Sequence, residues 1–155
     1  MATSPGKHAF PKQRLAAALP DHIGEWRRTS LGTPVPSSEY EADPAMQASY
    51  ARAAQRAKAE VVDLGAAGVA AAKMPMPAGS ASRQTDSGTE RAYTSKGRLV
   101  REELERDGGM GSTSVALGNG LSVRISGKGL DGPTLQALID GVDLGALEAL
   151  KRSAR

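Results

Sequence analysis

Three glycines near the end of the chain have the spacing of a nucleotide-binding loop. Gly127, Gly129 and Gly132 spell G-x-G-x-x-G within the segment SGKGLDGPTLQAL. In dinucleotide-binding folds such glycines follow a strand and open a helix, whose N-terminus holds the pyrophosphate. The alternating segment LSVRIS precedes them here and a helical pattern follows. The local order is therefore the one that nucleotide chemistry requires.

The remainder of the chain does not fit a dinucleotide fold. That fold needs a second parallel strand after the helix, and an acidic residue about 20 residues on to bind the ribose. Only 23 residues follow Gly132, and all of them have a helical pattern. We therefore expect a corner that leads from a strand into a helix. One chemical hypothesis stays open at this corner, an anion site formed by Lys128, Gly129 and Gly132 at the helix N-terminus.

No catalytic, cofactor or metal site is predicted elsewhere. The two histidines, His8 and His22, have no partner at metal-ligand spacing, and no serine lies in a G-x-S-x-G motif. The chain has no cysteine, which excludes disulfides and thiolate chemistry. One segment mixes acidic and basic residues, and we expect it to be a solvated strand face with cross-strand ion pairs. Its charged residues are Arg98, Arg101, Glu102, Glu103, Glu105, Arg106 and Asp107.

Composition indicates one small domain with a lean core. The chain has 155 residues, of which 39% are hydrophobic and only 3% aromatic. The scarcity of aromatic residues argues against single-strand binding by base stacking. The formal net charge of +3 is a mild excess that does not specify nucleic acid as a partner. No apolar run approaches the roughly 20 residues of a membrane span.

The N-terminal part predicts a flexible arm that enters the domain near a tryptophan. Residues 1–18 are read as a basic arm, which is either a solvated leader or a binding arm. Trp26 is the only tryptophan, and it is either a core anchor or a side chain that stacks on a ligand. Trp26 is therefore a candidate contact residue, together with Lys128, Gly129 and Gly132.

The middle of the chain allows two interpretations. Residues 46–64 contain two alternating runs that favour a β-hairpin, whereas their content of Ala, Gln, Arg, Lys and Glu favours one helix. We favour the hairpin. An alanine-rich helix is expected over residues 65–76, followed by a mobile polar loop at 77–88.

The second half predicts a meander and a helical C-terminus. Residues 89–126 contain four short alternating segments joined by turns, which is typical of an antiparallel meander with one solvated face. Leu135, Leu138, Ile139 and Val142 then share one helix face. The expected fold is one α+β domain at 19–152 with a tail at 153–155. It has an antiparallel sheet of five to six strands, with the alanine-rich and C-terminal helices packed on one face.

Several segments together resemble a known set of proteins. These are LPDHIGEWRRTS, AEVVDLGAAG, TERAYTSKGRLVREE, SVALGNGLSVRISGKG and IDGVDLGALEALK. The pattern is similar to a loosely defined set of small, uncharacterised proteins that bacteria export. The resemblance covers about residues 19–151 through structural motifs. It implies a periplasmic or envelope setting and a non-enzymatic role, and it brings no catalytic residues to this chain.

The expected function is that of a small, non-enzymatic binding or structural module of the bacterial envelope. It would act by contact with a protein partner and carry no cofactor. The alternative is a cytosolic or phage-type protein that meets nucleic acid through its basic N-terminal arm. The localisation is periplasmic or envelope if a signal peptide was removed, and cytoplasmic otherwise.

Overall fold

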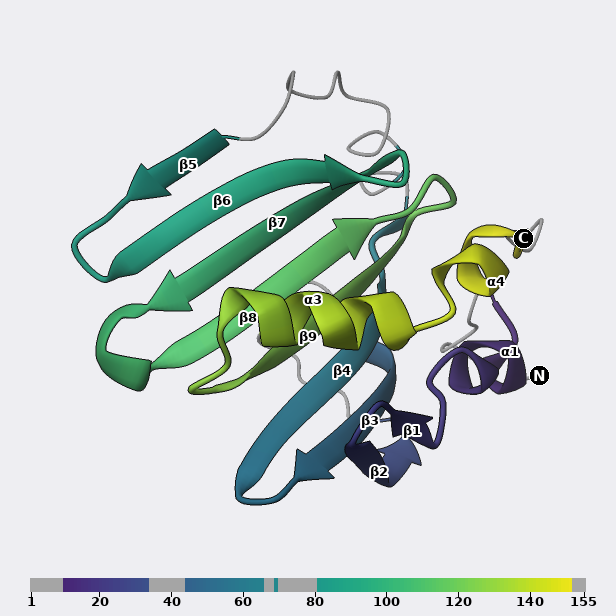
Figure 1. Cartoon of the computed structure of the whole chain (residues 1–155). Coiled ribbons are helices and arrows are strands. Elements are labelled where there is room, and N and C mark those ends of the chain that lie inside the picture. The colour runs from purple at the N-terminus through teal and green to yellow at the C-terminus, as the bar shows by residue number, and fades with distance from the viewer. Residues whose placement is uncertain (1–9, 34–43, 66–68, 70–80, 152–155) are drawn as a thin grey trace.

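A computed structural model describes residues 10–33, 44–65, 69 and 81–151 of the chain. Over these residues, nine strands form one antiparallel sheet in the order β1-β2-β3-β4-β9-β8-β7-β6-β5 (Figure 1). The strands are β1 (His22–Ile23), β2 (Trp26–Gly32), β3 (Pro44–Arg52), β4 (Gln55–Asp63), β5 (Ala81–Gln84), β6 (Gly88–Ser95), β7 (Arg98–Glu105), β8 (Met110–Ala116) and β9 (Leu121–Lys128). The helices are α1 (Lys12–Ala17), the 3-10 turn η1 (Arg106–Gly108), α3 (Gly132–Gly141) and α4 (Leu144–Glu148). The α+β class is confirmed.

The hairpin predicted at 46–64 is confirmed, and the helical alternative is wrong. Strands β3 and β4 pair antiparallel, with Ala48 opposite Ala59 and Tyr50 opposite Ala57. All four of these side chains are buried. Burial at every second residue suits a strand with one buried face, and it outweighs the helical propensity of the intervening polar residues.

The four-stranded meander is confirmed as β6, β7, β8 and β9. The turn between β6 and β7 has Lys96 and Gly97 in the left-handed region, at φ 53° and 80°. Two such residues in succession match the twist of the strands that flank a tight hairpin. Strand β9 then pairs with β4, with Val123 opposite Val61, so the meander joins the first hairpin in one sheet.

The prediction of five to six strands is wrong, because the sheet has nine. Two of the additional strands, β1 and β5, lie at the two edges of the sheet. Strand β1 has only two residues, and β5 (Ala81–Gln84) lies in the polar segment that was expected to be a loop. Neither edge strand shows an alternating apolar pattern, because β1 has only His22 and the buried Ile23, and β5 has the sequence Ala-Ser-Arg-Gln.

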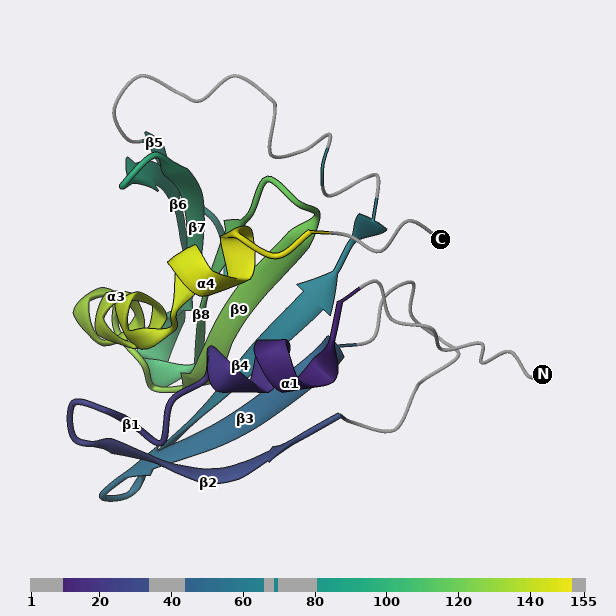
Figure 2. The ribbon, with the colours of Figure 1, turned by 90° about the vertical axis from the view of Figure 1, so that its right-hand side faces the viewer.

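The described helices lie on one face of the sheet, which is called the inner face here (Figure 2). Helix α3 crosses β8 and β9, and α1 packs on β3. The predicted C-terminal helix is confirmed, although it is split into α3 and α4. Asp131 caps the first helix by accepting from Thr134 N at 2.9 Å, and Asp143 caps the second by accepting from Ala146 N at 3.0 Å. The expected alanine-rich helix at 65–76 lies almost wholly outside the described residues.

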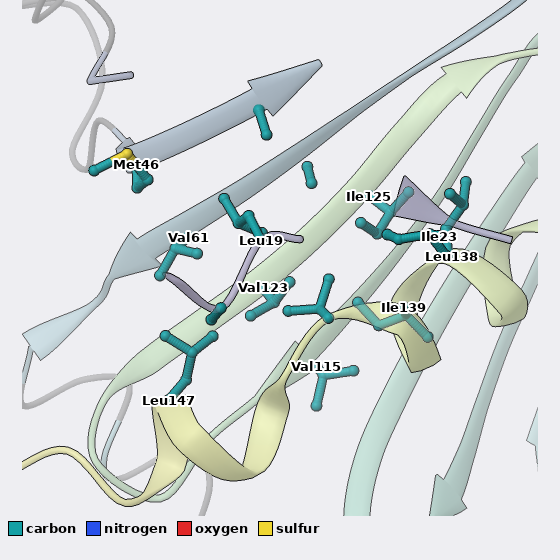
Figure 3. Packing of buried hydrophobic residues seen from close by; sticks show 14 of the residues in the cluster. Leu19, Ile23, Met46, Val61, Val115, Val123, Ile125, Leu138, Ile139 and Leu147 are labelled. Carbon is teal, nitrogen blue, oxygen red and sulfur yellow. The ribbon is translucent and has the colours of Figure 1, made fainter. Parts of the chain in front are cut away.

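The core lies between this helical layer and the inner face. Figure 3 shows Leu138 and Ile139 of α3, with Leu147 of α4, near the valines and isoleucine of the central strands. Phe10, Leu15 and Ala18 are also at most 2% exposed. We expected the domain to begin at residue 19. The chain, however, already packs into the core at Phe10, Leu15 and Ala18. No described helix is long and apolar enough to cross a membrane.

Candidate binding surface

The opposite side of the sheet, called the outer face here, carries no described helix. Side chains that are directly opposite on paired strands share a face, so the strand pairing identifies its members. One continuous row crosses eight strands from β2 to β5. It consists of Ser30, Ser49, Lys58, Ser126, Ser112, Glu103, Glu90 and Arg83. This row is therefore polar throughout and consists of four serines and four charged side chains.

Basic side chains are concentrated on one half of the outer face. Strands β2, β3, β4 and β9 present five basic residues there and one acidic residue, Glu60. The basic residues are Arg27, Arg56, Lys58, Arg124 and Lys128. All five are exposed, and none forms an ion pair with a described residue. This half of the face therefore has a positive potential that no described side chain neutralises by direct pairing.

A shallow hollow lies within this basic half. The pairing of β4 with β9 ends at Lys58 and Ser126, and a hollow of about 390 Å³ opens beside that end. Its lining includes Met110, Lys58, Lys128 and Arg56, and it exposes more apolar than polar surface. Met110 is 45% exposed, so its side chain contributes apolar surface to the hollow. The hollow thus combines an apolar surface with a basic rim.

The three motif glycines form the predicted corner from a strand into a helix. A Cβ atom on Gly127 would lie 2.4 Å from the Arg56 carbonyl oxygen and 2.8 Å from Leu130 Cδ1. Gly129 has φ +74°, in the region that glycine occupies without strain. Gly132 begins α3, where a Cβ would lie 3.3 Å from Glu102 Oε1. The spacing of the glycines is therefore explained by the path of the chain over the sheet.

Two carboxylates already lie at the N-terminus of α3. Asp131 bonds the amide of Thr134, and Glu102 lies next to Gly132. The side chain of Lys128 belongs to the outer face, on the other side of the sheet from α3. The anion site at Lys128, Gly129 and Gly132 stays a prediction, and a bound anion there would have to approach both carboxylates.

Trp26 lies in the core cluster and is 2% exposed. Its ring is covered by the guanidinium of Arg52, which lies 4.7 Å from the ring centroid. This geometry is a cation–π contact at the edge of the core. The structure therefore does not bring Trp26 together with Lys128 on one surface.

Glu102 was wrongly expected on the solvated face. Its side chain points to the inner face between Val100 and Leu104 and is 4% exposed as a residue. Glu102 Oε1 lies 3.4 Å from Arg91 Nε, a long contact that partly compensates the buried charge. The alternation of Val100, Glu102 and Leu104 was the signal that could have placed it.

Directly opposite Glu102 on β8, Thr113 is also buried. Its hydroxyl has no hydrogen-bond partner among the described residues. Next to Arg91, the ring of Tyr93 lies 4.5 Å from the guanidinium carbon, and burial raises the pKa of the Tyr93 phenol. These groups form a polar cluster within the inner face, and Glu102 in this cluster lies beside Gly132 at the start of α3.

Within the described ranges, no group of three or more histidines and carboxylates is arranged to hold a metal ion. Comparisons with family models, with curated proteins and with solved structures found no match for this chain.

Proposed function

We propose that this protein is a non-enzymatic binding or structural module of the bacterial cell envelope. It acts by protein–protein contact, and the outer face of the sheet is its contact surface. The envelope setting rests on the resemblance to exported bacterial proteins.

The charge of the outer face is the observation that carries the proposal. An antiparallel sheet commonly leaves one face to water, so an uncovered face alone would mean little. This face is unusual because its basic half presents five basic side chains against one acidic side chain. Unpaired charges of one sign steer an oppositely charged partner and fix its register.

The alternative, contact with nucleic acid through residues 1–18, has less support. Residues 1–9 lie outside the described part of the chain, and Leu15 of α1 is buried against the sheet. None of the described outer-face residues is aromatic, so the face lacks the rings on which bases stack.

The proposal is tested by blocking the outer face without changing its charge. Ser114 lies on the outer face between Arg124 and Arg101, in the middle of the sheet. A Ser114→Trp variant places a bulky side chain there, and Gln136→Trp places the same side chain on the exposed side of α3. Each tagged protein is expressed in the organism that encodes it, and its envelope and cytosolic fractions are crosslinked separately. The protein is then purified from each fraction with and without nuclease treatment.

We expect the wild type and Gln136→Trp to capture the same envelope protein and Ser114→Trp to lose it. Equal capture by all three proteins would refute the outer face as the contact surface. Recovery of the protein in the cytosol, with capture that depends on nucleic acid, would refute the envelope proposal in favour of the alternative.

A further inference from the structure

We infer that the hollow at the end of the β4–β9 pairing binds an extended acidic segment of a partner protein, anchored by one apolar side chain. This inference rests on the proposed function and names the chemistry of the partner. Met110, Lys58, Lys128 and Arg56 contribute the exposed side chains of its lining, which also includes Ser49, Tyr50, Ala57, Ser126 and Gly127.

The basic rim has the spacing of an extended peptide. Arg56 and Lys58 are two residues apart on β4, so their Cα atoms are about 7 Å apart. Lys58 is opposite Ser126, and Lys128 is two residues further along β9, a diagonal separation of about 7–8 Å. An extended peptide repeats its side chains on one face at the same interval of about 7 Å. Carboxylates on one face of such a peptide therefore match cations of the rim.

The charges of the rim are available to a partner. Lys58 and Lys128 form no ion pair with a described residue, and Arg56 donates only to the backbone carbonyls of Ala53 and Gln55. Glu105 also lies beside Met110, because its carboxylate accepts from the Met110 amide at 2.9 Å, but it forms no ion pair with any of the three cations. Three cations therefore face solvent around the hollow.

The surface within the rim is apolar, which distinguishes a peptide from a purely charged ligand. Met110 is opposite Lys128 in the strand pairing and is 45% exposed. Methionine is flexible and polarizable, and it is used at surfaces that accept apolar side chains of varied shape. The lining also includes Tyr50, but this residue is 1% exposed, so its ring is not available to stack a base. The apolar surface therefore fits an aliphatic anchor better than a nucleobase.

These features define the probe. In an extended peptide, residues i, i+2 and i+4 share a face, so the sequence Leu-Ser-Glu-Ser-Glu presents one apolar side chain followed by two carboxylates that are about 7 Å apart. The protein is labelled with ¹³C at its methionine methyl groups, and the peptide is titrated into the full chain. Met46 serves as an internal control, because it is 5% exposed and lies in the core.

We expect the Met110 methyl signal to shift in a saturable way while the Met46 signal stays in place. Lys58→Glu and Lys128→Glu should each weaken binding at least about tenfold, because each replaces attraction by repulsion at close range. Lys12→Glu is the matched control, since Lys12 is exposed on α1 and lies in the helical layer. Binding should also weaken as salt rises, because the pairs are exposed. If a charge-reversed variant does not fold, Lys58→Gln and Lys128→Gln test the same contacts.

Several results would overturn the inference. These are a Met110 signal that does not move, charge variants that bind as the wild type does, and equal binding of Ser-Ser-Glu-Ser-Glu. A short DNA duplex that moves the Met110 signal at lower concentration than the peptide would also overturn it, in favour of nucleic acid. If the peptide fails while Ser114→Trp still abolishes capture in the envelope, only the partner chemistry is wrong. If both fail, the proposed function is wrong as well.

Discussion

The corner between β9 and α3 makes a prediction about two glycines that are opposite each other. Gly111 on β8 pairs with Gly127 on β9, and the chain crosses back over both at Leu130. A Cβ on Gly111 would lie 2.3 Å from the Leu130 carbonyl oxygen. Carbon and oxygen atoms in real side-chain contacts are more than 3 Å apart, so Gly111→Ala must displace the backbone at Leu130.

The size of the effect follows from two opposing contributions. Overpacking of this kind costs about 1–3 kcal/mol, and a clash with backbone belongs at the upper end of that range. Replacing glycine by alanine restricts the unfolded chain and returns about 0.4–1 kcal/mol. The net loss is then about 2 kcal/mol, which for a chain of this length lowers Tm by about 4–8 °C.

Gly118→Ala is the matched control. Nothing lies within 4 Å of a Cβ at Gly118, and its φ is not in the left-handed region. Only the effect on the unfolded chain remains, so Tm should stay unchanged or rise by about 1–4 °C. Thermal unfolding followed by circular dichroism measures both variants. If Gly111→Ala melts at or above the Tm of Gly118→Ala, the account of the corner as a close backbone crossing is wrong.

Three further predictions concern the capping, a buried phenol and the single tryptophan. Removing the cap in Asp131→Ala should lower the stability by about 1 kcal/mol, whereas Asp131→Asn should keep most of it, since asparagine also accepts at this position. Hydrogen bonds from the hydroxyl and the amide of Thr134 lower the pKa of Asp131 below 3.8, so its contribution is present above about pH 4 and is lost as the pH falls through the lowered pKa. Comparison of Tm at neutral pH and near pH 3 should show this loss in the wild type, and an equal loss in Asp131→Asn would contradict it. Burial raises the pKa of the Tyr50 phenol to about 12, and its hydroxyl donates to the Pro20 carbonyl at 2.7 Å. The neutral phenol therefore stabilises the fold fully below about pH 10, and this stability is lost as the pH rises toward 12, so Tyr50→Phe should reduce the alkaline fall of Tm. Trp26 is 2% exposed, so its fluorescence should be blue-shifted and poorly quenched by acrylamide until the protein unfolds, and efficient quenching in the native state would place the ring at the surface instead.

Local patterns predicted those elements whose buried residues recur at regular intervals. The four apolar residues of the α3 face, Leu135, Leu138, Ile139 and Val142, are all at most 3% exposed. The hairpin of β3 and β4 was also predicted, because Ala48, Tyr50, Ala57 and Ala59 alternate with polar residues. Periodicity of this kind reports which side of an element meets the core, and it needs no knowledge of the partner element.

Glu102 illustrates where that reasoning failed. Its charge suggested solvent, although its position between Val100 and Leu104 placed it on the inner face. Successive side chains along a strand point to opposite faces of the sheet. A charged residue at an inward position therefore stays inward if the apolar residues two positions before and after it are buried. The prediction for Glu102 gave more weight to its charge than to its position in the alternating pattern, and the position determines its burial.

The hollow beside Met110 could not have been predicted from the sequence. It requires β4 to pair with β9, whose residues are separated by more than fifty positions along the chain. Arg56, Lys58 and Lys128 share a face only as a result of that pairing. Pairing between distant strands depends on how the whole chain packs, and no local pattern specifies it.

By itself, the sequence determined the α+β class, the hairpin, the meander, the C-terminal helical pattern and the corner at Gly127, Gly129 and Gly132. Each of these follows from interactions within a few residues or from the period of one buried face. The tertiary structure alone decided the order of the nine strands and the gathering of unpaired cations on the outer face. Those features depend on contacts between distant segments, and the same local elements could have been joined in other orders.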